Sequence, residues 1–174
     1  MKWLLLAAAL AGPALAAPPE PDGYRMDDYR APVPATLQGA LVLHVDAMRE
    51  LVRRREAVLI DVLPAPRRPA AMREGVPWLP APHRSLPGAL WWPDIGRGAL
   101  PPEVEARFRE RLQRAVGSPP RLAVFFCLSE CWMSWNAAKR AVAFGLRVAW
   151  FPEGADGWEA AGLPLEVVQP EWLE

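Results

Sequence analysis

The chain of 174 residues carries 20 acidic and 20 basic side chains, so its formal net charge at neutral pH is zero. This balance gives no electrostatic attraction to nucleic acid or to an anionic membrane, and we expect neither as a partner. Hydrophobic residues make up 52% of the sequence, and Pro occupies 21 positions. We therefore expect one domain with a sizeable core and long irregular connections.

Residues 1–16 are typical of a secretory signal peptide. A single Lys precedes an apolar stretch over residues 3–11, and small residues stand at Ala14 and Ala16. The apolar stretch is well below the roughly 20 residues that a membrane-spanning helix needs. We expect cleavage near Ala16, export to the periplasm, and no membrane span after cleavage.

The first half of the remaining chain combines irregular segments with two strands. Residues 17–36 are rich in Pro and charge, and we expect them to form an extended N-terminal arm. A strand is predicted over 41–45, with Asp46 as the N-cap of a following helix. A buried strand over 57–62 follows, because its sequence is nearly all apolar or β-branched. Residues 64–88 form a loop of unusual length, which is typical of a functional cover or a partner surface.

The second half alternates short strands with helices. The predicted elements, in chain order, are a strand at 87–92, a helix at 101–116, a strand at 122–126, a helix at 134–144, a strand at 147–151 and a helix at 157–164. Strands that alternate with helices in this way favour a parallel sheet. The predicted fold class is therefore α/β, with a five-stranded, mainly parallel sheet and helices on both faces.

Both cysteines of the chain lie in one turn, within the sequence FFCLSECWMSWNAAKRA at 125–141. Cys127 directly follows the strand at 122–126, so it lies at the carboxyl edge of the sheet, where parallel sheets bind ligands. Its sulfur would face the positive end of the next helix, which favours a nucleophilic thiolate. The alternative is a buried structural cysteine, a common environment for this residue type.

Cys131 follows Cys127 by four positions. In a helical turn this spacing corresponds to roughly 6 Å between Cα atoms, which a disulfide permits. In an oxidising compartment the pair would close easily, and Cys131 could resolve a persulfide or mixed disulfide on Cys127. A permanent disulfide is the other interpretation, although so small a closed loop would stabilise the fold little.

The order of several segments resembles the single-domain rhodanese fold. The segments are LIDV (59–62), PGALWWP (87–93), LAVFFC (122–127) and GWEAAGLPLE (157–166). The resemblance covers roughly residues 37–166 and implies a rhodanese-like domain over 37–174. Cys127, Cys131 and Trp132 further resemble the exported rhodanese-like family that is named for a cysteine-cysteine-tryptophan (CXXCW) motif. That family is associated with catabolism by pyrroloquinoline quinone (PQQ)-dependent enzymes.

This resemblance implies that Cys127 cycles through a persulfide, with loop amides around the transferred group. The substrate-binding loop would comprise Leu128, Ser129, Glu130, Trp132, Met133 and Ser134. Glu130 departs from the usual loop, in which small and cationic residues are common, and an acid there disfavours a dianionic donor such as thiosulfate. The implied activity is sulfur transfer or thiol–disulfide exchange on a small sulfur or disulfide substrate, without a cofactor.

Three other residues admit a structural interpretation. Trp132 and Trp135 share a helix face and could flank the site, but core packing is the commoner use of that spacing. Asp61 ends its strand at the same edge of the sheet as Cys127. In rhodanese-like proteins this position usually holds a neighbouring loop, so we assign it no catalytic role.

Two other classes of protein remain open. Cys-x-x-x-Cys between a strand and a helix also resembles exported Cu(I) chaperones, but these need a downstream His, whereas His44 and His83 precede the pair. We therefore assign no metal ligand. The second class is a noncatalytic accessory protein for a periplasmic quinone-dependent dehydrogenase or its cytochrome. The loop 64–88, with Trp78 and the Trp91–Trp92 pair, would then offer a docking surface.

Overall fold

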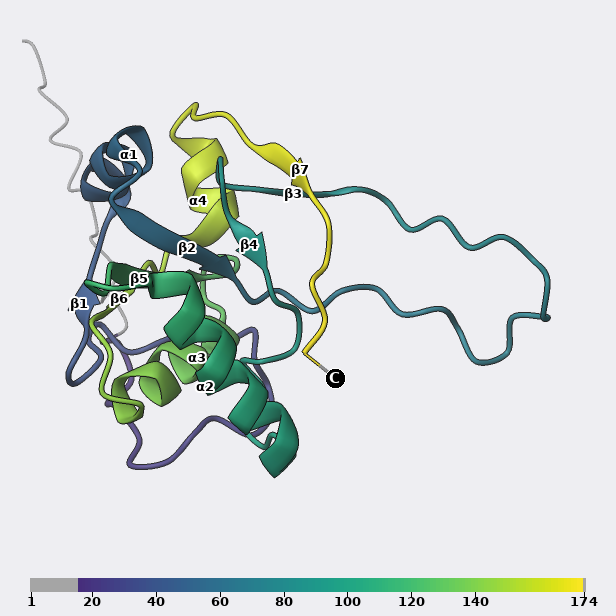
Figure 1. The fold of residues 1–174 in the computed structure, drawn as a ribbon, viewed down its shortest axis with the longest axis horizontal. Coiled ribbons are helices and arrows are strands. Elements are labelled where there is room, and N and C mark those ends of the chain that lie inside the picture. Colours follow the sequence, from purple (N-terminus) through teal and green to yellow (C-terminus); the bar gives the residue numbers. More distant parts are fainter. Residues whose placement is uncertain (1–15, 174) are drawn as a thin grey trace, which may run out of the picture.

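The apolar segments of the sequence form the strands of a parallel sheet at the centre of the fold (Figure 1). The computed structural model describes residues 16–173, so the predicted signal peptide lies almost entirely outside the described residues. In spatial order the strands are β1 (Leu41–Val42), β6 (Val148–Trp150), β5 (Leu122–Phe126), β2 (Ala57–Asp61) and β4 (Leu90–Trp91). All neighbouring strands of this sheet pair in parallel, as the alternation of elements predicts.

Helices cover both faces of the sheet. One face packs against α1 (Val45–Arg54) and α4 (Gly154–Ala160), and the other packs against α2 (Pro102–Val116) and α3 (Trp132–Ala143). Successive strand residues point to opposite faces, so Phe125 packs toward α2 and α3 while Phe126 packs toward α1 and α4. The predicted α/β fold class is confirmed.

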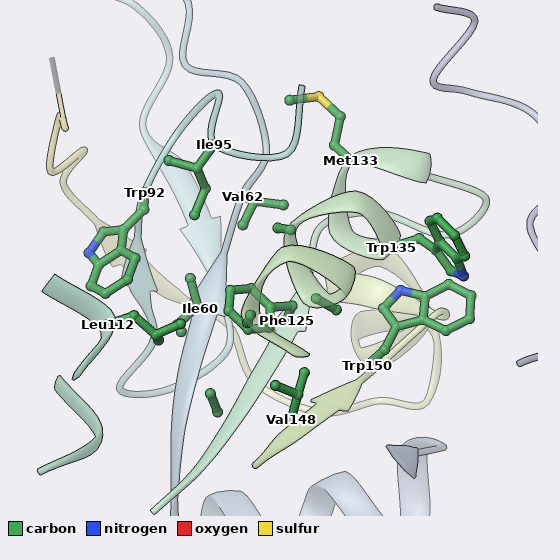
Figure 2. Close-up of a cluster of buried hydrophobic side chains, with 14 of the residues drawn as sticks. Ile60, Val62, Trp92, Ile95, Leu112, Phe125, Met133, Trp135, Val148 and Trp150 are labelled. Atoms are coloured by element: carbon green, nitrogen blue, oxygen red, sulfur yellow. The ribbon is translucent and has the colours of Figure 1, made fainter. Parts of the chain in front are cut away.

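The larger core cluster fixes the helix that follows the cysteines. Figure 2 shows Phe125 among Ile60, Leu112 and Val148, and the ring of Phe108 meets that of Phe125 edge-to-face at 6.0 Å. Trp135 of α3 is fully buried in the same cluster. The core interpretation of Trp135 is therefore confirmed, and α3 is held firmly against β5 and β6.

Several element boundaries differ from the predicted ones. His44 is the N-cap of α1, and Asp46 lies in the first helical turn, where an acidic side chain also complements the helix dipole. The helix α3 begins at Trp132 rather than near Ser134, and α4 begins at Gly154 rather than at residue 157. Both helices thus start closer to the cysteines than the sequence suggests.

A second, two-stranded sheet was not predicted. It pairs β3 (His83–Ser85) with β7 (Glu166–Val168) in antiparallel orientation. The long loop therefore ends before residue 83, and Figure 1 shows it projecting away from the body between β2 and β3. Within residues 16–173 no helix has the length and apolarity required to cross a bilayer.

Candidate functional site

Cys127 and Cys131 form a disulfide at the carboxyl edge of the parallel sheet. Their Cα atoms are 6.4 Å apart. Cys127 directly follows β5, and Cys131 is the N-cap residue of α3. Cys127 is fully buried and Cys131 is only 3% exposed. In this oxidised state neither sulfur is a nucleophile, because the thiolate is the reactive form.

The loop between the two cysteines is fixed by α4. The backbone N–H of Ser129 donates to Asp156 Oδ1 at 2.6 Å, and its hydroxyl donates to Asp156 Oδ2 at 2.7 Å. The backbone N–H of Ala155 donates to the Cys127 carbonyl at 2.8 Å. Asp156 therefore takes the place that a bound anion would occupy at this amide, and sequence analysis did not identify it.

The N-terminal arm, residues 17–36, covers the start of α3. The carbonyl of Tyr29 accepts a hydrogen bond from the Trp132 backbone N–H at 2.9 Å, and Arg30 forms an isolated antiparallel bridge with Cys131. The indole of Trp132 donates to the Pro32 carbonyl at 3.1 Å. The family resemblance implies that loop amides surround the transferred group. The amides of Ser129 and Trp132 are instead already hydrogen-bonded, to Asp156 and to the Tyr29 carbonyl.

The same arm is anchored farther along α3 by a buried charge. Arg140 is only 1% exposed, and its guanidinium lies 4.0 Å from the ring centroid of Tyr24. It also donates to the Gly98 carbonyl at 2.5 Å, and its Nε lies 3.7 Å from Glu105. Burial lowers the pKa of Arg140, while the nearby Tyr24 and Glu105 raise it. The arm is therefore an integral layer over α3.

Glu130 is the exposed member of the predicted substrate loop. It adopts a left-handed backbone conformation with a φ of 50°. Together with arm residues that include Pro32 and Val33, it lines a hollow of about 600 Å³. The residue directly before Cys131 thus borders a hollow whose other walls are apolar arm residues.

The remaining predicted loop residues have structural contacts. Leu128 is half-buried and bridges Gly154. Met133 is buried in the first turn of α3. The buried hydroxyl of Ser134 donates to the Cys131 carbonyl at 2.9 Å and accepts from the Trp150 indole at 3.0 Å. These contacts fix the backbone on which Cys131 sits.

Asp61 shares the sheet edge with Cys127 but faces the other way. It pairs in register with Phe126, the residue before Cys127, and successive residues point to opposite faces. Its carboxylate accepts hydrogen bonds from His83 Nε2 at 2.7 Å, the Ser85 hydroxyl at 2.6 Å and the Leu63 backbone N–H at 2.9 Å. These bonds tie β2 to β3, which agrees with the structural role expected for Asp61.

The sequence also suggested two other kinds of site, a metal site and a docking surface. In the described part of the chain, no group of three or more His, Cys, Asp or Glu side chains could hold a metal ion. Trp91 and Trp92 are both buried, so they do not form part of a docking surface, contrary to one possibility raised by the sequence. The exposed large hydrophobic side chains of the long loop are instead Val76 and Leu79, and Leu79 is 91% exposed.

Comparisons with known proteins show a likeness of fold. No family model matches the chain, and no curated protein matches it significantly. Among solved structures, thiosulfate sulfurtransferase from Pseudomonas aeruginosa is 20% identical with a TM-score of 0.48, over 76% of this chain and 21% of that chain. BH2092 protein from Bacillus halodurans is 15% identical with a TM-score of 0.50, over 74% of this chain and 77% of that chain.

An uncharacterized protein from Saccharomyces cerevisiae is 16% identical with a TM-score of 0.41, over 72% of this chain and 95% of that chain. This chain thus spans 21%, or about a fifth, of the length of the Pseudomonas sulfurtransferase. The five-stranded parallel sheet with helices on both faces defines the class of the molecule as α/β. At these identities the likeness concerns the fold, and any activity has to be argued from the site.

Replacement of Asn136 by Ala is expected to loosen the arm. The buried Asn136 amide accepts from the Arg25 backbone N–H at 2.9 Å, and donates to the carbonyls of Arg25 at 2.8 Å and Gly96 at 2.9 Å. Its loss leaves buried polar groups unpaired, so the free energy of unfolding should fall by about 2–4 kcal/mol. Reduction of the disulfide by dithiothreitol should become faster.

Urea unfolding and timed thiol alkylation measure these two effects. Gln38→Ala is the matched control, because Gln38 is exposed and its side chain makes no hydrogen bond within residues 16–173. Equal reduction rates in the two variants would show that the arm does not limit access to the disulfide.

Proposed function

We propose that this protein is an exported rhodanese-like protein that handles sulfur or disulfides, with Cys127 as the nucleophile and Cys131 as the resolving thiol. The observation that carries the proposal is the Cys127–Cys131 bond at the carboxyl end of β5 and the start of α3. Ligands of open parallel sheets bind at this edge. A permanent crosslink would add only about 2 kcal/mol there, because short loops gain least from crosslinking.

The proposed reaction begins from the reduced pair. The Cys127 thiolate attacks the outer sulfur of a persulfide donor, RSSH. A new S–S bond forms on Cys127, the S–S bond of the donor breaks, and RS⁻ leaves. The Cys131 thiolate then attacks Cys127 Sγ. This second step forms the observed disulfide and releases the outer sulfur as hydrosulfide, so two thiolates are oxidised while one sulfane sulfur is reduced.

A thiol reductant would restore the starting state. Its thiolate attacks Sγ of Cys131, which has the slight residual exposure, and the Cys127 thiolate leaves. The second thiol of a dithiol then attacks its own sulfur in the mixed disulfide and releases Cys131. As the N-cap of α3, Cys131 is stabilised as a thiolate by the helix N-terminus. The arm and the loop at Glu130 have to move for the reductant to enter.

A direct test uses the reduced protein and glutathione persulfide. Intact mass under non-reducing conditions, together with released hydrosulfide, should show one hydrosulfide per disulfide formed. Thiosulfate should be a poorer donor, because Glu130 repels a dianion. If the protein neither gains sulfur nor releases hydrosulfide beyond a sample with both cysteines alkylated, the proposed function is wrong.

The cellular setting belongs to the same proposal. The segment 1–16 supports export to the periplasm with cleavage near Ala16. The resemblance of Cys127, Cys131 and Trp132 supports service to PQQ-dependent alcohol catabolism, with a quinone-dependent dehydrogenase or its cytochrome as partner. The N-terminal residue of the protein from a periplasmic extract, and growth of a deletion strain on alcohols, test these two statements separately.

An accessory role without catalysis is the second candidate. The observation that favours it is the projecting loop with the exposed Leu79. In that case Leu79→Ser would abolish growth on alcohols, whereas replacement of both cysteines would not.

A further inference from the structure

A second hollow, of about 540 Å³, lies at the amino edge of the parallel sheet. Its walls come from the last turn of α1, the first residues of β2, the turn before β4, the residue before β5, and β7. The disulfide follows the other end of β5, and a strand of five residues is roughly 17 Å long. This hollow is therefore separate from the site of the cysteines.

The floor of this amino-edge hollow is apolar. Leu51 and Val52 of α1 meet Ala57 and Leu59 of β2, and all four belong to, or pack against, the smaller core cluster. Pro87 closes one side. The volume lies within the range of roughly 300–1,000 Å³ that is usual for small-molecule sites. The floor can thus take a short apolar body out of water.

The rim is cationic. The lining residues include Arg53, Arg55 and Arg121, against Glu166 as the single acidic residue. Glu166 already accepts a hydrogen bond from the Gly88 backbone N–H at 3.2 Å. Positive charge therefore exceeds negative charge around the opening, which attracts an anion.

The three arginine side chains differ in the hydrogen bonds that they already make. Arg53 donates to Glu50 at 2.7 Å, and this bond lowers the pKa of Glu50. Arg121 uses one terminal nitrogen for the Ala115 carbonyl, at 2.9 Å. The Arg55 side chain forms no hydrogen bond or ion pair with any residue that the structure describes. Arg55 and the remaining donors of Arg121 are thus available to a ligand.

We propose that the amino-edge hollow binds a small amphipathic anion, with its anionic head on Arg55 and Arg121 and its apolar body on Leu51 and Leu59. A carboxylate suits this site, because a guanidinium offers it two parallel N–H donors. The head group belongs to a free organic acid or to an anionic lipid, and the two sources are separated by the test below. This site works independently of the cysteines.

The test titrates the full chain with hexanoate, followed by isothermal calorimetry and amide NMR shifts. Hexanol, the neutral analogue, should bind at least about 10-fold more weakly than hexanoate. Inorganic phosphate should also bind more weakly than hexanoate. Arg55→Glu and Arg121→Glu should each weaken hexanoate binding about 10-fold. Both side chains are exposed, so both variants should fold, and either one alone suffices for the comparison.

Arg84→Glu is the matched control, because Arg84 is an exposed arginine of β3 outside this hollow. It should bind hexanoate like the original chain, and so should Cys127→Ser, which separates this proposal from the proposed function. Binding to phosphatidylglycerol vesicles that is lost in Arg55→Glu would support the site with a lipid as the source of the anion. Equal binding of hexanoate and hexanol, or no effect of both Arg replacements, would overturn the proposal.

Discussion

Cys127→Ser is expected to lower the release of hydrosulfide from a persulfide donor on the order of 100-fold or more. The variant lacks the sulfur that forms the first covalent bond with the donor. Cys131→Ser should instead retain that bond. Because its resolving thiol is missing, the outer sulfur should stay on Cys127 and be visible as an added sulfur in the intact mass.

The pair of variants is its own control for stability. Each lacks the same crosslink, and for so short a loop that loss costs about 2 kcal/mol. A difference in activity between them therefore reports chemistry. Hydrosulfide released from the persulfide donor measures turnover. The added sulfur on each variant, and its transfer to cyanide, measure the first step. If an added sulfur persists in Cys127→Ser and disappears in Cys131→Ser, the two roles are reversed.

Gly154→Ala is expected to distort the disulfide loop and to lower the free energy of unfolding by about 3 kcal/mol or more. Gly154 has a φ of +61°, and a Cβ there would lie 2.5 Å from the Cys127 carbonyl oxygen and 2.6 Å from the carbonyl carbon of Leu128. Both neighbours are backbone atoms and cannot rotate away. The helix α4 would have to separate from the loop that it holds through Asp156.

Gly162→Ala is the control without the steric clash, so the difference between the two variants gives the steric part of that effect. Gly162 has a φ of +75°, and nothing lies within 4 Å of the Cβ that would be added. This control should therefore show only the cost of a left-handed Ala, about 1–2 kcal/mol. Urea unfolding measures both variants, and the rate of disulfide reduction should rise in Gly154→Ala alone. Equal losses of stability would mean that the contact of α4 with the loop is unimportant.

The central strands could be predicted because burial on both faces leaves a continuous apolar sequence. The segments 57–62 and 122–126 have that property and form β2 and β5. The strands β3 and β7 lack it. Each has three residues, among them His83, Arg84 and Glu166, and they pair across roughly 80 positions of sequence. No local periodicity distinguishes such strands from a loop.

The cysteine pair could also be predicted, because a spacing of four residues limits the distance between the two sulfurs. The groups that hydrogen-bond to the residues around the two cysteines could not be predicted. Asp156 acts on Ser129 across 27 positions, and Pro32 accepts from Trp132 across 100 positions. A carboxylate in a short helix and a carbonyl in a Pro-rich segment have many possible partners. Tertiary packing alone decides which one each of them finds.

The arm over α3 also fixes an order of events. Residues 17–36 leave the ribosome long before Trp132, yet they have no surface to dock on until α3 has formed. The arm must therefore dock late in folding. Until it does, Cys131 lacks its bridge with Arg30, and an oxidant reaches the cysteine pair more readily. After the arm has docked, the disulfide is shielded. The oxidation state that the cysteines reached during folding therefore persists until the arm moves away.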